Sequence, residues 1–109
     1  MNERVNLKFK VYCKETKWGD NLYIVGNTNE LGNWKTDNLN ESQKLNGNLY
    51  PMWLSNIISI EKKDNIKYKY IIKGPNKLKW EDCANRRLEF QYTIKRNGIY
   101  MVDDGFFGE

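Results

Sequence analysis

Residues 66–73 read Ile66-Lys67-Tyr68-Lys69-Tyr70-Ile71-Ile72-Lys73 and give the clearest structural signal in the chain. Successive side chains of a β-strand point to opposite faces of the sheet. One face would therefore carry Ile66, Tyr68, Tyr70 and Ile72, and the other would carry Lys67, Lys69, Ile71 and Lys73. This alternation predicts a strand with an apolar inner face and a largely basic outer face.

Shorter stretches with the same period of two occur on both sides of this strand. They cover residues 5–13, 21–27, 53–60, 78–80, 88–94 and 99–102, with turn signals between them. In the stretch 88–94 we expect Leu88, Phe90, Tyr92 and Ile94 to point inward. Residues 28–50 lack this period and are expected to form long loops with one helical turn near 29–31. About seven short strands without a long helical pattern indicate an all-β sandwich or barrel.

The composition limits the chemistry that the chain can perform. Its 109 residues fit a single domain, 1–109. The sequence contains no histidine, so the commonest general base and metal ligand is missing. Glu81 and Asp82 are adjacent, and on a strand they would point in opposite directions instead of forming the facing pair of a glycoside hydrolase. We therefore expect a non-catalytic chain without a cofactor or a metal ion.

The ends and the charge of the chain suggest where it works. No stretch approaches the roughly 18 apolar residues of a membrane span, and the N-terminus lacks the apolar segment of a secretory signal. We therefore expect a cytoplasmic location, no membrane partner, and free thiols at Cys13 and Cys83. The net charge of +4 comes from residues spread between Lys8 and Arg96. This spread argues against a dedicated nucleic-acid binder, which usually concentrates its basic residues on one face.

Aromatic residues are frequent in this otherwise polar chain, which is 14% aromatic and has a mean hydropathy of −0.83. Trp18, Trp34 and Trp80 lie in or beside polar loops, where core residues are not expected. A flat ring beside amide and ammonium donors suits a sugar, because the C–H face of the pyranose stacks on the ring and its hydroxyls form hydrogen bonds. The same residue types could stack nucleic-acid bases or form a protein-contact patch. These residues therefore leave open a carbohydrate-binding, a single-stranded nucleic-acid-binding and a protein-interaction domain.

A series of motifs narrows this choice. In chain order they are Asn21-Leu22-Tyr23-Ile24-Val25-Gly26-Asn27, Glu30-Leu31-Gly32-Asn33-Trp34, Tyr50-Pro51-Met52-Trp53, Tyr68-Lys69-Tyr70, Trp80-Glu81 and Asn85-Arg86. Over about residues 3–102 the chain resembles the starch-binding domains of carbohydrate-binding module family 20. The resemblance implies an antiparallel, immunoglobulin-like β-sandwich of seven to eight strands. It also implies non-catalytic binding of α-1,4-glucans such as starch, glycogen or malto-oligosaccharides.

The resemblance further implies which residues contact the sugar. By their match to the family motifs they are Trp34, Lys69, Trp80, Glu81 and Asn85, with the two tryptophans as the stacking pair. Trp53 matches a tryptophan that is usually structural. Some family members have a second site built from loop aromatics, for which Trp18 and Tyr50 are the candidates here.

The C-terminal residues suggest a connection to another domain. Residues 103–109, Asp103-Asp104-Gly105-Phe106-Phe107-Gly108-Glu109, resemble the segment that follows such a domain in eukaryotic glycerophosphocholine phosphodiesterases. We therefore expect them to begin a tail or linker. The domain would then tether a covalently attached partner, such as a glycerophosphodiesterase or another hydrolase, to the polymer.

Overall fold

The alternating stretch at residues 66–73 forms β6 (Lys67–Gly74) in the middle of a four-stranded sheet. In the computed structural model, which describes residues 3–109, β6 pairs with β2 (Asn21–Gly26) and with β7 (Lys77–Trp80). The short strand β8 (Arg86–Arg87) pairs with the beginning of β6. Because all of these pairs are antiparallel, residues directly opposite each other project from the same face.

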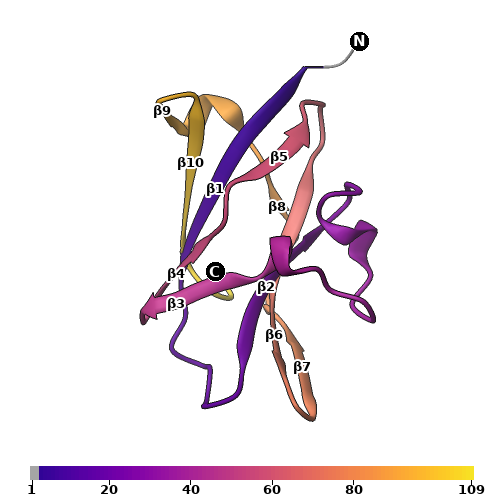
Figure 1. The fold of residues 1–109 in the computed structure, drawn as a ribbon, viewed down its shortest axis with the longest axis vertical. Coiled ribbons are helices and arrows are strands. Elements are labelled where there is room, and N and C mark those ends of the chain that lie inside the picture. Colours follow the sequence, from indigo (N-terminus) through magenta and orange to yellow (C-terminus); the bar gives the residue numbers. More distant parts are fainter. Residues whose placement is uncertain (1–2) are drawn as a thin grey trace.

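A second sheet of six strands packs against the first (Figure 1). Its strands are β1 (Arg4–Tyr12), β3 (Leu45–Leu49), β4 (Met52–Ser55), β5 (Ile58–Glu61), β9 (Ile94–Arg96) and β10 (Ile99–Phe106). They follow the order β3-β4-β1-β10-β9, with β5 pairing to β1 beside β4. The first and last strands run in the same direction, so β1 and β10 form a parallel pair, and the other pairings among the described strands are antiparallel. The predicted all-β sandwich is confirmed. The described residues form ten strands instead of seven to eight, and the β1–β10 pair departs from the expected antiparallel arrangement.

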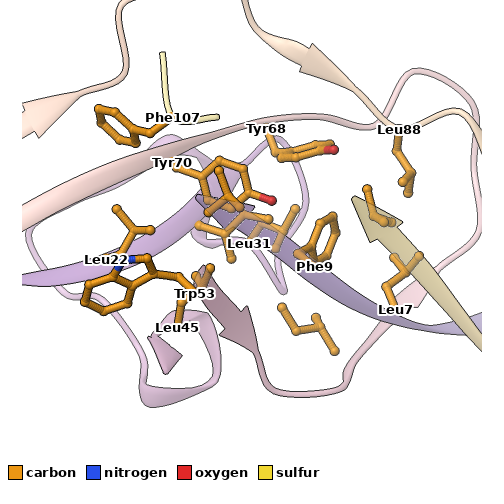
Figure 2. Packing of buried hydrophobic residues seen from close by; sticks show 14 of the residues in the cluster. Leu7, Phe9, Leu22, Leu31, Leu45, Trp53, Tyr68, Tyr70, Leu88 and Phe107 are labelled. Carbon is orange, nitrogen blue, oxygen red and sulfur yellow. The ribbon is translucent and has the colours of Figure 1, made fainter. Parts of the chain in front are cut away.

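The core lies between the two sheets, where the predicted inner face of β6 meets β1. Tyr68, Tyr70 and Ile72 are fully or almost fully buried, and so are Leu7 and Phe9 on β1. Figure 2 shows the Phe9 ring close to Tyr68, in an edge-on contact with the ring centroids 5.1 Å apart. Edge-on aromatic pairs add to the stability that apolar burial supplies. The alternation of residues 66–73 therefore decides which side of the smaller sheet becomes the core.

Trp53 also belongs to the interior, as the family resemblance implied. It is 7% exposed, lies beside Leu22 and Leu45 in Figure 2, and donates a hydrogen bond from Nε1 to the carbonyl of Cys13 at 3.2 Å. Gly47 packs against this ring, since a Cβ atom there would lie 2.6 Å from it. Trp53 therefore has a structural role in core packing, whereas Trp18 and Trp80 are exposed.

The structure corrects two expectations about secondary structure, one for the loop at residues 28–50 and one for the strand at residues 88–94. Residues 28–50 contain strand β3 and two short 3-10 helices, η1 (Gly32–Trp34) and η2 (Glu41–Gln43). The stretch 88–94 is not a strand, because its middle forms a third 3-10 helix, η3 (Phe90–Tyr92). Leu88 is buried as expected, but Tyr92 is 82% exposed and Ile94 is 62% exposed. These two side chains therefore do not belong to the core.

The expected tail at residues 103–109 is also corrected. Strand β10 continues through Phe106, and Phe107 is 8% exposed within the core cluster. The Asp104 carboxylate accepts hydrogen bonds from the hydroxyls of Tyr68, at 2.8 Å, and Tyr70, at 2.6 Å. Residues 103–107 are therefore part of the sandwich, and they satisfy two buried tyrosines of β6.

No helix within residues 3–109 has the length and apolar character that crossing a membrane requires.

The role of the C-terminal residues can be tested with two adjacent phenylalanines. Phe107→Ala should lower the free energy of unfolding by about 3 kcal/mol, because it removes a buried aromatic ring from the core. The matched control is Phe106→Ala, whose ring is 59% exposed and which should cost less than about 1 kcal/mol. Urea denaturation followed by tryptophan fluorescence measures both. Equal effects would contradict the inclusion of Phe107 in the core.

Candidate functional site

The loop between β2 and β3 presents Trp34 in an unusual backbone conformation. Gly32, Asn33 and Trp34 have φ values of 80°, 51° and 66°. Positive φ costs a bulky residue such as tryptophan on the order of 1–3 kcal/mol, and such strain is concentrated at functional sites. Leu31 is fully buried and anchors the loop, and the Asn33 amide N–H donates to the carbonyl of Thr28 at 2.9 Å. The fold thus holds Leu31 inside and turns Trp34 outward.

Trp80 lies beside Trp34, although 46 positions separate them in the sequence. It is the last residue of β7, opposite the buried Ile71 of β6. The two indole rings have centroids 6.3 Å apart and planes inclined at 43°. Trp80 is 37% exposed and Trp34 is partly exposed, so the rings form a tilted apolar platform open to solvent.

Two polar residues of the predicted site, Lys69 and Asn85, lie on β6 and on the loop after β7. Lys69 projects from the outer face of β6, as its alternation predicts, and its Nζ donates to the carbonyl of Glu81 at 3.2 Å. Its amine is therefore held next to Trp80. Asn85 is exposed on the loop that follows β7. The structure thus brings Trp34 and Trp80 together, fixes the Lys69 amine on the backbone of the residue after Trp80, and leaves Asn85 exposed on the loop that follows.

Glu81 does not join them, and its predicted role as a sugar contact is wrong for the side chain. That side chain has no exposed surface. Its Oε2 accepts hydrogen bonds from the Tyr70 amide at 2.9 Å and Arg86 Nε at 3.0 Å. Its Oε1 accepts from Arg86 Nη2 at 2.9 Å and from the Gly108 amide at 3.0 Å. The carboxylate is saturated inside the protein, and only its backbone carbonyl reaches Lys69.

These hydrogen-bond donors keep the Glu81 carboxylate ionised. Burial raises the pKa of its carboxyl, but the hydrogen bonds from Arg86, Gly108 and Tyr70 outweigh that effect and hold the pKa below its usual value. The nearby Asp104 carboxyl shows the opposite balance. Burial raises its pKa above the usual value, and the hydrogen bonds from Tyr70 and Tyr68 offset only part of that effect. Glu81 is therefore the ionised partner of Arg86 at neutral pH.

Arg86 stands in the quoted motif Asn85-Arg86, but the sequence alone assigned it no role. Arg86 donates two hydrogen bonds to the Glu81 carboxylate. It also donates from Nη1 to the Asp104 carbonyl at 3.0 Å and from Nη2 to the Phe106 carbonyl at 2.9 Å. It therefore fastens the loop after Trp80 to the end of β10. The signal available in the sequence was an arginine five positions after an acidic residue in one polar loop, which is too common a pattern to single it out.

Trp18 and Tyr50 line a separate cavity of about 810 Å³, as their assignment to a common second site requires. Trp18 is completely exposed at the tip of the loop between β1 and β2, and Tyr50 is 52% exposed after β3. The Tyr50 hydroxyl donates to the Lys14 carbonyl at 3.2 Å, which fixes the ring beside this loop. Amide and ammonium side chains complete the wall of the cavity, among them Asn21, Lys44, Asn46 and Asn48.

Neither cysteine shows a role at these sites. Cys13 is buried, Cys83 is partly buried, and both are free thiols. Burial raises the pKa of each thiol, which keeps it protonated and unreactive at neutral pH. Across residues 3–109, no three His, Cys, Asp or Glu side chains are grouped so that they could hold a metal ion.

Comparisons with known proteins relate the chain to one family over most of its length. A family model described as "Starch binding domain" matches residues 4–98. Glucoamylase-1 of Schizophyllum commune is 37% identical over 89 residues, which are 82% of this chain and 14% of that protein. The cyclomaltodextrin glucanotransferase of Bacillus sp. (strain 1-1) is 40% identical over 107 residues, and the match covers 91% of this chain and 14% of that protein. The chain thus spans about one seventh of the length of these relatives.

Solved structures show the same fold. The glycoside hydrolase family 15 glucoamylase of Hypocrea jecorina matches with a TM-score of 0.73 and 22% identity, covering all of this chain and 18% of that one. The family 20 carbohydrate-binding module of the maltotetraose-forming amylase from Pseudomonas saccharophila matches with a TM-score of 0.61 and 23% identity. That match covers 94% of this chain and 100% of the other.

The buried pair gives a prediction about stability and pH. Glu81→Gln removes the charge but keeps the shape, and it should lower the free energy of unfolding at pH 7 by roughly 3 kcal/mol. The Glu81 pKa is lower in the folded state, so its stabilisation is present above the unfolded value of about 4.3 and is lost as the pH falls through the folded value. The difference between wild type and variant should therefore shrink between pH 7 and strongly acidic pH.

Urea denaturation across this pH range measures the difference. Asp82→Asn is the matched control, because it changes an exposed carboxylate at the next position and should have little effect at any pH. A difference between wild type and Glu81→Gln that stays constant with pH would contradict an ionised Glu81.

Proposed function

This chain belongs to the starch-binding domains of carbohydrate-binding module family 20, a non-catalytic class, and from that premise we propose that Trp34 and Trp80 form its main α-glucan site. The observation that carries the proposal is the pair of neighbouring, solvent-open indole rings, with the Lys69 amine bound to the backbone of the residue after Trp80. Glucose units would stack their C–H faces on the two inclined rings. Lys69 and Asn85 would donate hydrogen bonds to hydroxyls at the rim.

The shape of the platform suits a curved polymer. Because the ring planes differ by 43°, two successive sugar units can each lie flat on a ring only if the chain bends between them. Linear polymers with flat repeats would contact one ring well and the other poorly. The tilt therefore supports α-1,4-linked glucans of the starch or glycogen type over extended glucans.

The second cavity supports a further glucan contact. We propose that the rings of Trp18 and Tyr50 stack on glucose units there, with the surrounding amide and ammonium groups as donors. Trp18 lies in the loop between β1 and β2 with its whole surface open to solvent, so its ring is free to stack on a ligand.

We propose that the module tethers an attached partner to the polymer. The relatives contain about seven times the length of this chain, and they are named as a glucoamylase and a glucanotransferase. An attached glucan-processing enzyme, a hydrolase or a transferase, is therefore better supported than the glycerophosphodiesterase expected from residues 103–109, which stays a prediction. We also propose a cytoplasmic location, where glycogen would be the polymer.

The main site is tested by Trp34→Ala and Trp80→Ala. Each should weaken binding of maltoheptaose by at least about tenfold, because truncating a central tryptophan of a binding site costs on the order of 2 kcal/mol. Tyr92→Ala is the control, since that ring is 82% exposed in η3, just before β9 of the larger sheet. Titration followed by tryptophan fluorescence gives the affinity, and co-sedimentation with granular starch and with glycogen compares the polymers.

Salt separates this function from the nucleic-acid alternative, which family membership does not favour. A neutral glucan releases no counterions, so its affinity should change little with salt, whereas oligonucleotide binding should fall steeply. An unchanged maltoheptaose affinity in both Trp34→Ala and Trp80→Ala would contradict the proposed main site.

The second site is tested by counting bound ligands. Calorimetric titration with β-cyclodextrin should give two molecules per wild-type chain and one for Trp18→Ala or for Trp80→Ala. The double variant should bind none, because each substitution removes one stacking platform. Two molecules bound to Trp18→Ala would show that the cavity does not depend on this ring.

A further inference from the structure

The outer face of the four-stranded sheet connects the two proposed glucan sites. Trp80 lies opposite Ile71, Ile71 lies opposite Tyr23, and Tyr23 forms a bridge with Lys44. Directly opposite residues of antiparallel strands project from one face, so these four form a single row across the sheet. Trp80 belongs to the main site, and Lys44 lines the cavity that contains Trp18.

The length of this row is set by the spacing of strands. Neighbouring strands lie about 4.8 Å apart, so three spacings place Lys44 roughly 14 Å from Trp80 along the sheet. In Figure 1, β2, β6 and β7 lie side by side over this region. The two sites are therefore separated by a short distance across a continuous strand surface, and not by the core.

A second row runs parallel to the first. Asn21 lies opposite Lys73, and Lys73 lies opposite Leu78. Leu78 is 44% exposed, Lys73 is exposed, and Asn21 lines the same cavity as Lys44. The second row therefore also leads from the neighbourhood of Trp80 to the second cavity.

The two rows combine the same kinds of side chain as the sites that they connect, namely apolar or aromatic surface with ammonium and amide donors. Tyr23 and Leu78 supply apolar surface, and Ile71, fully buried beneath its neighbours, forms the floor between them. Within residues 3–109, the amines of Lys44 and Lys73 form no hydrogen bond or ion pair. Long cations over an apolar strip, with their donors unused, suit a neutral ligand rich in hydroxyl groups.

We propose that this bridging strip, formed by Asn21, Tyr23, Lys44, Lys73 and Leu78, lets one α-glucan chain run from the Trp34–Trp80 platform into the Trp18–Tyr50 cavity. The inference rests on the proposed function of both sites. A chain that has bound one site reaches the other as an intramolecular step, at an effective concentration set by the short span. The strip would guide the chain along that span, so the module would favour long linear glucans over short ones.

The test compares a short with a long ligand. Wild type should bind a long linear maltodextrin at least about tenfold more tightly than maltotriose, with one chain per protein, because bridging raises the avidity. The double variant Lys73→Ala with Leu78→Ala changes exposed residues of the strip only. It should lose most of that advantage and bind more than one long chain per protein, while its maltotriose affinity stays unchanged.

Calorimetry gives both affinity and stoichiometry. The matched control is Lys95→Ala with Ile94→Ala, an exposed cation and aliphatic pair on β9 of the other sheet. An unchanged long-chain advantage in the strip variant would overturn the inference, and so would two long chains bound per wild-type protein. Absence of binding to both ligands in the wild type would overturn the proposed function itself.

Discussion

The buried ion pair between Glu81 and Arg86 is the interaction on which the main site depends. The Glu81 side chain is completely enclosed and accepts four hydrogen bonds, two of them from Arg86. Since neighbouring side chains of an extended chain point in opposite directions, an inward Glu81 requires an outward Trp80. Arg86 also binds two carbonyls at the end of β10. One guanidinium therefore holds together the loop that carries the site and strand β10 of the larger sheet. Removing the charge of Arg86 would leave the Glu81 carboxylate buried without its cationic partner.

The core and the binding surface are two faces of the same strands, and this makes the surface rigid. On β6, Tyr68 and Tyr70 pack inside while Lys69 projects outside. Asp104 accepts from both tyrosine hydroxyls, so the inner face is also fixed by hydrogen bonds. Trp34 is held in a costly backbone conformation by a loop whose Leu31 is buried. A platform preorganised in this way loses little freedom when it binds a glucan, which is an advantage for an open site with few contacts.

Several features of the fold could be predicted because they depend on local alternation. The period of two in residues 66–73 gave the correct faces of β6, and Trp34, Trp80, Lys69 and Asn85 are all at the surface. The same rule failed at Tyr92 and Ile94, where the alternation is present but the chain turns through a 3-10 helix before it reaches a partner strand. It also failed at residues 103–109, because nothing local shows that Asp104 meets two tyrosines more than thirty positions earlier. Period alone carries no information about partners that are distant in the chain.

The sequence by itself determined the all-β class, the inner and outer faces of the main strands, and the residue types available for binding a sugar. These follow from the alternation of side chains and from composition, which are properties of short segments. Only the tertiary structure decided that Glu81 is buried, that Arg86 fastens the site to β10, and that Trp34 and Trp80 meet at 6.3 Å. It also decided that Trp18 and Tyr50 line one cavity, and that the outer face of β2 and β6 connects this cavity with the main site. These arrangements result from pairing and packing between strands far apart in the chain, whose register no single segment specifies.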